Sequence, residues 1–226
     1  MKMHMKLMIK GWHHTRTGFT LTELLVAALI GGIAVTMAGW GMVALLQNNQ
    51  RVEEQATTRM NLSRALDFIS DDIRSAIKVS TTAPSDWTTP SGYNLVMFIE
   101  KPADNLEEQE DGTLASTPQV AYYTRAKTSG INWRGPMILY RQKGSGNVAQ
   151  GNPQALIDGI ADTSPNCSSN LTGAVDSGTS KGGFRVFVQH QRNVKLCIAG
   201  LVMPTNTIYQ TETLAAVRSG SATPTP

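Results

Sequence analysis

One carboxylate, Glu23, lies inside the start of a long apolar run, in the stretch "RTGFTLTELLVAALIGGIAV" (residues 16–35). From Leu24 to Leu46 there are 23 residues without a charge, which is enough for a helix that spans a membrane. An ionised carboxylate at this position is costly unless it is paired or solvated. We therefore expect the carboxylate of Glu23 to be paired with another group. A plain membrane anchor with its basic flank in the cytoplasm explains the charges around the run but not Glu23.

Residues suited to catalysis or to metal binding are few. Three of the four histidines, His4, His13 and His14, lie in the first 18 residues, and His190 lies in a strand-like stretch. The sequence contains no Cys-x-x-Cys, His-Glu-x-x-His or Gly-x-Ser-x-Gly pattern. We therefore expect no enzyme: no catalytic residue, no cofactor and no metal site.

The charge of the chain is concentrated in its first residues. The whole sequence of 226 residues has 20 basic and 17 acidic side chains, a net charge of +3. Residues 1–18 hold four basic residues and no acid, so the remainder has 16 basic and 17 acidic side chains and a net charge of −1. A general nucleic-acid-binding surface is therefore not expected. A local patch of Arg185, Arg192 and Lys195 could still bind nucleic acid.

The segment "TGFTLTELLV" (residues 17–26) resembles the N-terminal signature of type IV prepilins and of the pseudopilins of type II secretion. In that family a prepilin peptidase cuts after a glycine, here Gly18, and the new N-terminal residue, here Phe19, is then N-methylated. A glutamate four residues later, here Glu23, is needed for assembly. The resemblance implies a leader peptide over residues 1–18. It also implies three kinds of partner: the peptidase, other pilins or pseudopilins in a filament, and an inner-membrane assembly platform.

The resemblance suggests what Glu23 is for. Cleavage between Gly18 and Phe19 creates an α-amine with a reference pKa near 8, which is mostly protonated at neutral pH. When apolar helices pack into a filament, the ammonium of Phe19 in one subunit can pair with Glu23 of its neighbour. A buried pair of this kind can fix the register between subunits. Before assembly, the apolar run would lie in membrane lipid.

The amphipathic pattern beyond Leu46 predicts that the helix continues. In "NLSRALDFISDDIRSAIKV" the apolar residues recur at spacings of three and four: Leu62, Leu66, Ile69, Ile73 and Ile77. We predict a transmembrane or filament-core half over residues 19–46 and an amphipathic half over 47–80, with the helix ending near Val79.

The rest of the chain, residues 81–226, predicts a globular β-rich domain. Strand-like runs bounded by Gly, Pro and Asn occupy residues 93–99, 119–125, 136–142, 183–191, 194–202 and 207–217. One long helix followed by antiparallel strands is an α+β arrangement of the pilin-like kind, with the sheet packed on the helix and long loops between strands.

Two features of this domain concern ligands and redox state. Cys167 and Cys197 are the only cysteines, and outside the cytoplasm they could form a disulfide. They could also be unrelated thiols, because Cys197 lies in an apolar strand. The five acids of "DNLEEQED" (residues 104–111) could bind Ca²⁺, but their spacing differs from an EF-hand loop and a solvated loop is the preferred interpretation.

Shorter segments narrow the resemblance to PilW-like minor pilins and J-type pseudopilins: "RALDFISDDIRSAI", "LYRQKG", "ALIDGI" and "YQTETLAAVR". The expected function is a minor pilin or pseudopilin, a structural subunit of a type IV pilus or of a type II-like secretion pseudopilus, including polysaccharide secretion. The expected location is the inner membrane, single-pass with the globular domain outside the cytoplasm, and then the filament. The alternatives are an anchored binding protein, such as an adhesin or DNA-uptake minor pilin, and a membrane-anchored enzyme.

Overall fold

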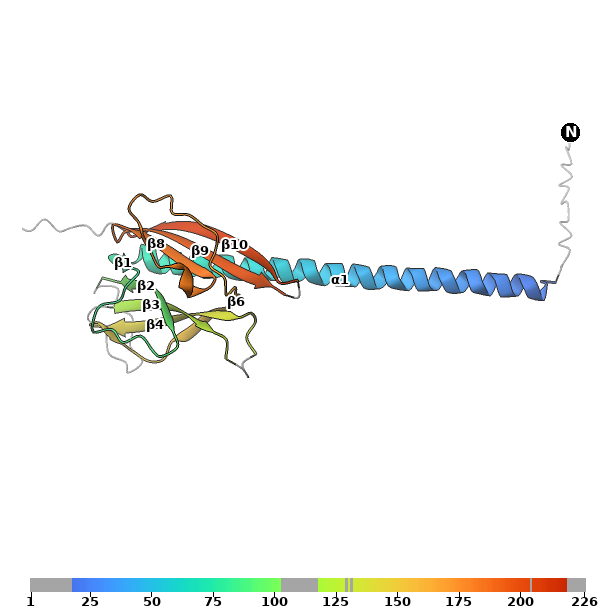
Figure 1. The fold of residues 1–226 in the computed structure, drawn as a ribbon, viewed down its shortest axis with the longest axis horizontal. Coiled ribbons are helices and arrows are strands. Elements are labelled where there is room, and N and C mark those ends of the chain that lie inside the picture. The colour runs from blue at the N-terminus through green and yellow to red at the C-terminus, as the bar shows by residue number, and fades with distance from the viewer. Residues whose placement is uncertain (1–17, 103–117, 129, 131, 204, 219–226) are drawn as a thin grey trace, which may run out of the picture. The chain divides into compact units, whose positions relative to one another are not determined.

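The computed structural model describes residues 18–102, 118–128, 130, 132–203 and 205–218. The chain divides into two compact units, one up to Asn49 and one from Gln50 onward. The boundary falls inside helix α1, Leu21–Arg74 (Figure 1). The leader, including its basic residues Lys2, Lys6, Lys10 and Arg16, and the acidic segment 104–111 lie outside the described residues.

The first unit is the apolar part of α1. Its side chains are exposed throughout, including Leu24 at 67% and Trp40 at 84% of their full accessible area. Isolated apolar residues at a protein surface are ordinary, but a continuous exposed apolar helix of this length marks a membrane or protein contact. By length and composition, α1 can cross a membrane.

The second unit begins with the amphipathic part of α1. The apolar stripe predicted from the sequence, Leu62, Leu66, Ile69 and Ile73, is buried against the sheet. On the sheet, Gly200 lies against this stripe, since a Cβ atom added there would meet a methyl group of Leu62 at 2.8 Å. The α+β fold class is therefore confirmed.

The helix ends earlier than the sequence predicted. It stops at Arg74 rather than near Val79, and Lys78–Ser80 forms strand β1 instead. The amide of Ile77 donates to the carbonyl of Glu100 at 2.8 Å, and the amide of Val79 donates to Gln191 at 2.9 Å. Strand pairing thus satisfies this backbone while it buries Val79. Ile77, which the helical pattern would bury, is 49% exposed.

The sheet is antiparallel and mixes long and short strands. Its order is β1-β2-β3-β4-β6-β9-β8-β7, with β10 paired to β9 and β5 paired to β4 (Figure 1). The bounds of the strands after β1 are β2 Asn94–Glu100, β3 Pro118–Ala126, β4 Met137–Ser145, β5 Val148–Ala149, β6 Gln154–Ile160, β7 Val175–Asp176, β8 Phe184–Gln189, β9 Asn193–Val202 and β10 Thr207–Ala216, with a short 3₁₀ helix at Thr179–Lys181. All six predicted strands are present as β2, β3, β4, β8, β9 and β10, and the sequence analysis missed the other four.

A buried charged cluster fastens the end of α1 to the sheet. Asp72 accepts hydrogen bonds from Lys101 Nζ at 3.0 Å, from the hydroxyl of Tyr122 at 2.5 Å and from Arg141 Nε at 2.9 Å. Burial alone would raise the pKa of the Asp72 carboxyl, but its bonds and its attraction to Arg141, Tyr122 and Lys101 outweigh burial and lower it. Asp72 therefore stays charged, and it joins the last turn of the helix to Tyr122 of β3, to Arg141 of β4 and to Lys101, which directly follows β2.

Candidate functional site

The predicted cleavage site lies just before the helix. Gly18, Phe19 and Thr20 precede the first helical residue, Leu21, and all three are exposed. Phe19 is 85% exposed, and no atom lies within 4 Å of a Cβ added to Gly18. The Gly18–Phe19 bond thus lies outside the helix in accessible chain, as a peptidase substrate requires.

Glu23 and Thr20 form a capping box at the start of α1. The Thr20 amide donates to Glu23 Oε2 at 3.1 Å, and the Glu23 amide donates in return to Thr20 Oγ1 at 3.4 Å. The Thr20 hydroxyl also donates to Glu23 Oε2 at 3.1 Å. These bonds satisfy backbone donors that the first turn of a helix leaves open, and an acid here also complements the helix dipole. This role was not predicted above, although Thr-x-x-Glu before an apolar run is the sequence signature of a capping box.

The capping box leaves Glu23 able to bind a second group. Its bonds to Thr20 use only Oε2. Oε1 has no hydrogen-bond partner among residues 18–102 or the other described parts of the chain. A carboxylate can accept several hydrogen bonds, so Glu23 can cap its own helix and still receive an ammonium group from another chain.

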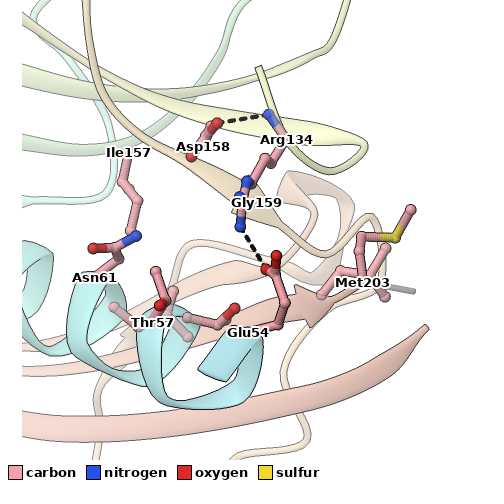
Figure 2. A pocket seen from close by; sticks show the side chains of 11 residues that line it. Glu54, Thr57, Asn61, Arg134, Ile157, Asp158, Gly159 and Met203 are labelled. Carbon is pink, nitrogen blue, oxygen red and sulfur yellow. Dashed lines mark hydrogen bonds and ion pairs between the residues drawn. The ribbon is translucent and has the colours of Figure 1, made fainter. Parts of the chain in front are cut away.

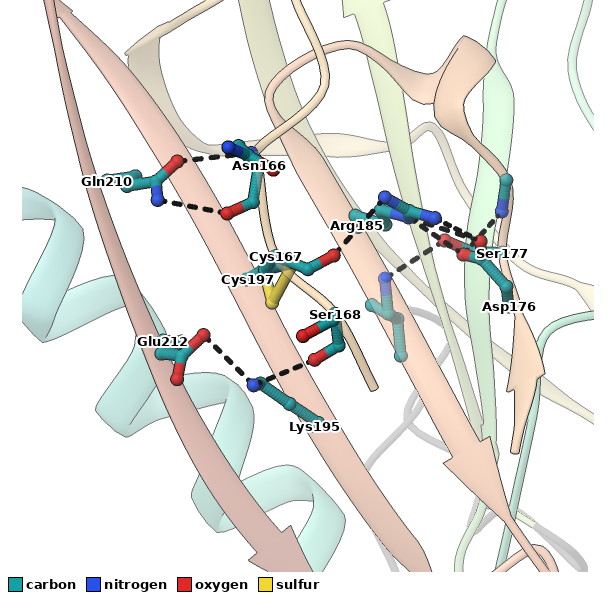
Figure 3. Close-up of a disulfide and its surroundings, with 12 residues drawn as sticks. Asn166, Cys167, Ser168, Asp176, Ser177, Arg185, Lys195, Cys197, Gln210 and Glu212 are labelled. Atoms are coloured by element: carbon teal, nitrogen blue, oxygen red, sulfur yellow. Dashed lines mark hydrogen bonds and ion pairs between the residues drawn. A yellow bond between two sulfur atoms is a disulfide. The ribbon is translucent and has the colours of Figure 1, made fainter. Parts of the chain in front are cut away.

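Cys167 and Cys197 form a disulfide, with their Cα atoms 6.6 Å apart (Figure 3). The bond ties the segment between β6 and β8 to strand β9. Hydrogen bonds on either side of Cys167 hold the same segment. The amide of Asn166 donates to Gln210 Oε1 at 3.1 Å, and Lys195 Nζ donates to the carbonyl of Ser168 at 2.9 Å. The segment is therefore fixed across the face of β9 and β10.

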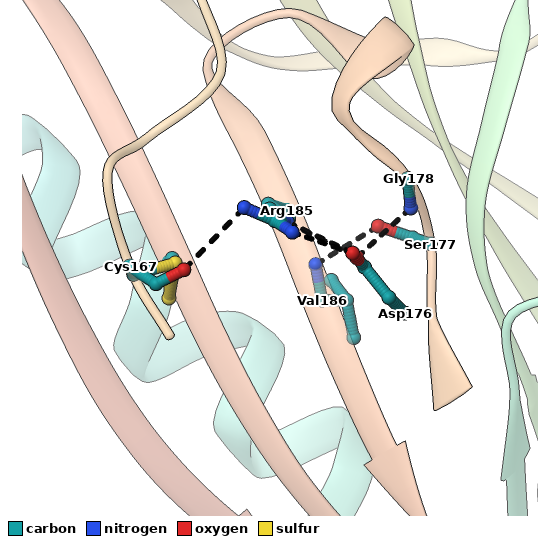
Figure 4. Close-up of polar contacts among 7 residues, drawn as sticks. Cys167, Asp176, Ser177, Gly178, Arg185 and Val186 are labelled. Carbon is teal, nitrogen blue, oxygen red and sulfur yellow. Dashed lines mark hydrogen bonds and ion pairs between the residues drawn. A yellow bond between two sulfur atoms is a disulfide. The ribbon is translucent and has the colours of Figure 1, made fainter. Parts of the chain in front are cut away.

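The basic patch suggested by the sequence is not a free surface. Arg185 donates to Asp176 Oδ2 at 2.6 Å, and this bond lowers the pKa of the Asp176 carboxyl (Figure 4). Lys195 has a side chain only 5% exposed and pairs with Glu212 at 3.0 Å. Arg192 alone is exposed, in the turn between β8 and β9. Two of the three basic residues are thus already paired with acidic residues of the same domain.

A small hollow lies between α1 and the chain around β6 (Figure 2). Arg134 crosses it, donating from its side chain to Glu54 Oε2 at 2.5 Å and from its amide to Asp158 Oδ2 at 2.6 Å. The acids of the hollow are therefore already paired with Arg134. Within the described residues no group of three His, Cys, Asp or Glu side chains could hold a metal ion. His190 is exposed, at the tip of the β8–β9 turn.

Comparison with known proteins gives one match. The family model described as the prokaryotic N-terminal methylation motif matches residues 14–39. No curated protein matches the chain, and no solved structure does. The match includes Gly18, Phe19 and Glu23, and it supports a type IV prepilin-like protein. The motif implies processing by a prepilin peptidase and assembly with other pilins, and together with the apolar helix it fits an inner-membrane anchor.

Proposed function

We propose that this chain is a minor pilin or pseudopilin, a structural subunit of a type IV pilus or of a type II-like secretion pseudopilus. The observation that carries the proposal is the capping box of Thr20 and Glu23, directly after the accessible Gly18–Phe19 bond. It opens a helix whose apolar side chains are exposed as far as Leu46. That combination suits a subunit that is cut before its anchor and keeps the anchor for assembly.

In this function, Glu23 works with the N-terminus that cleavage creates. Removal of residues 1–18 leaves the Phe19 ammonium at the start of the mature chain, and methylation keeps its charge. As the apolar helices leave lipid for the filament core, the ammonium of one subunit pairs with the carboxylate of the next. The assembly platform would hold the subunits while this exchange occurs. We assign the chain no catalytic role.

The globular unit would lie outside the cytoplasm, where the disulfide of Cys167 and Cys197 is stable. The segment that resembles PilW-like minor pilins and J-type pseudopilins, "RALDFISDDIRSAI", has a structural role here. It buries Leu66, Ile69 and Ile73 and supplies Asp72 to the charged cluster.

Processing tests the proposal directly. Co-expression with a prepilin peptidase should shorten the chain by its 18 leader residues and leave a methylated Phe19. Gly18→Val should block cleavage, because the peptidase site accommodates a small residue. The structure leaves open space around Gly18, so the substitution should not disturb the fold. Intact-mass measurement gives the answer, and one identical product from both proteins would contradict the proposal.

A further inference from the structure

Strand β10 forms a long open edge of the sheet. It pairs with β9 over ten residues without a register shift, from Thr207 opposite Val202 to Ala216 opposite Asn193. The other side of β9 pairs with β8 and, at one position, with β6. Among the described strands, β10 has no second neighbour. One row of its backbone groups therefore faces away from the sheet.

Two backbone hydrogen bonds show which residues make up this row. Val217, just beyond β10, donates its amide to Arg192 at 2.8 Å, while Ala199 of β9 donates away from β10, to Gly183 at 2.7 Å. Ala199 lies opposite Gln210. Bonding and non-bonding pairs alternate along an antiparallel ladder. The odd residues of β10 therefore bond to β9, and the amides that face outward are those of Ile208, Gln210, Glu212, Leu214 and Ala216.

This edge lacks the features that usually prevent pairing with another chain. Natural edge strands are protected by lysine or proline, by bulges or by short length. β10 has none of these, and its one charge, Glu212, is neutralised by Lys195 at 3.0 Å. Two apolar side chains flank the middle of the edge, Ile208 at 48% and Leu214 at 62% exposure. The edge is therefore ready to receive a strand.

We propose that β10 binds an extended segment of a different pilin-like subunit, which adds to the sheet as a further strand. Backbone hydrogen bonds to the outward amides would supply affinity, and side chains would supply specificity. The added strand should place apolar side chains beside Ile208 and Leu214 and a basic, amide or hydroxyl side chain beside Glu212. The proposal rests on the proposed function, because it needs neighbouring subunits.

A second copy of this chain is a poorer partner, although its side chains would match. Two antiparallel β10 strands could place Ile208 opposite Leu214 and Gln210 opposite Glu212. In each copy, however, α1 and β10 run in the same direction. Arg59 stacks on Tyr209 at 4.7 Å, and fifteen residues further along the helix the carbonyl of Arg74 accepts from the amide of Arg218 at 3.2 Å.

Antiparallel pairing of two β10 strands would therefore set the two globular units, each with its own segment of α1, in opposite directions, whereas the subunits of one filament would point the same way. The strands at the two ends of the sheet path are also too short to match β10, since β1 has three residues and β7 has two. We therefore take a distinct subunit as the occupant, and a second copy paired through β10 is the alternative outcome of the test.

Proline substitution tests the edge one amide at a time. Leu214→Pro removes an outward amide that makes no bond within the subunit, and proline is tolerated in an edge strand at such positions. The full-length variant should fold, with its disulfide and melting temperature retained. Its fraction in sheared filaments, relative to membranes, should fall about tenfold, the scale of one lost hydrogen bond. Leu214→Ala keeps the amide and is the matched control, with a smaller loss expected. Thr213→Pro removes an amide bonded to β9 and should fail to fold.

A second variant decides the case in which Leu214→Pro does not fold. The double variant Ile208→Lys and Leu214→Lys changes only exposed side chains and places two positive charges along the edge, which opposes pairing. It should fold and also be excluded from filaments. Entry at the wild-type level by the lysine variant, or by folded Leu214→Pro, would overturn the proposal. A detergent-solubilised dimer of the wild type that Leu214→Pro abolishes would overturn it in favour of a second copy. If Glu23→Ala is excluded in the same assay, the proposed function stands in either case.

Discussion

Substitution of Glu23 separates its two roles, the cap of its own helix and the partner of a neighbour's ammonium. Glu23→Gln keeps an acceptor that can complete the capping box but removes the charge. Glu23→Ala removes both. Glu23→Asp keeps the charge but shortens the side chain by one methylene. Thr20→Ala keeps the carboxylate and removes the hydroxyl that bonds to it.

Loss of the two roles should differ in its free-energy cost. Loss of a helix cap costs about 0.5–2 kcal/mol. Loss of one partner of a buried ion pair costs about 3–5 kcal/mol. At about 1.36 kcal/mol for each factor of ten, loss of the pair lowers assembly by roughly two orders of magnitude or more. Glu23→Gln and Glu23→Ala should therefore both be excluded from filaments. Thr20→Ala should lose about 30-fold at most, and Glu23→Asp should show a partial defect.

The assay is the fraction of each variant in sheared filaments against that in membranes. All four variants should remain inserted, because none of the changes adds a charge to the apolar segment. All four should also be cleaved, since the changes lie beyond the Gly18–Phe19 bond. If Glu23→Ala assembles like the wild type, the carboxylate does not set register and the pilin-like mechanism is wrong. If only Glu23→Gln assembles normally, the carboxylate serves as a helix cap and not as half of an ion pair.

Two further predictions concern the globular unit. Asp72→Asn should lower the free energy of unfolding by about 3 kcal/mol, because it leaves Lys101 and Arg141 buried without their carboxylate; Asp71→Asn, at an exposed pair, should cost less than about 1 kcal/mol. The folded-state pKa of Asp72 is lowered, so its contribution is present above the unfolded pKa of about 3.9 and is lost as the pH falls through the folded value. Denaturant titrations of both variants at neutral and acidic pH measure this, and equal losses from the two variants would contradict it. Non-reducing peptide mapping should recover Cys167 and Cys197 in one disulfide-linked pair, and reduction should cost roughly 3–4 kcal/mol. Two alkylatable thiols in material from an oxidising compartment would refute it.

The sequence predicts most of the fold because its elements are strongly periodic. The stripe from Leu62 to Ile73 has helical spacing, and the six long strands are rich in β-branched and aromatic residues. Strand β6 was missed because its pairing with β4 is irregular and Gly159, at φ 73°, interrupts it. At strand β1 the sequence pattern predicts helix, because Ile77 continues the helical spacing. Only the distant carbonyls of Glu100 and Gln191 make it a strand.

The N-terminal site could be predicted from the sequence because it depends on a local pattern and not on tertiary contacts. Gly18, Phe19 and Glu23 are neighbours in sequence, so their relation can be read from the chain. The pairing of Arg185 with Asp176 and of Lys195 with Glu212 depends on which strands lie side by side. Counting charges along the sequence therefore overstated the free basic surface.

Asp72 shows how helical spacing can also reveal a buried charge. It lies three residues after Ile69 and ten after Leu62, which places it on the buried side of the helix, whereas Asp71 lies on the exposed side. A carboxylate on a buried helical face must have cationic or hydroxyl partners. Glu23, at the other end of α1, is exposed, and its bonds to Thr20 use only Oε2. The globular unit thus pairs its buried carboxylate internally, whereas in the proposed function Glu23 would find its partner in a neighbouring subunit.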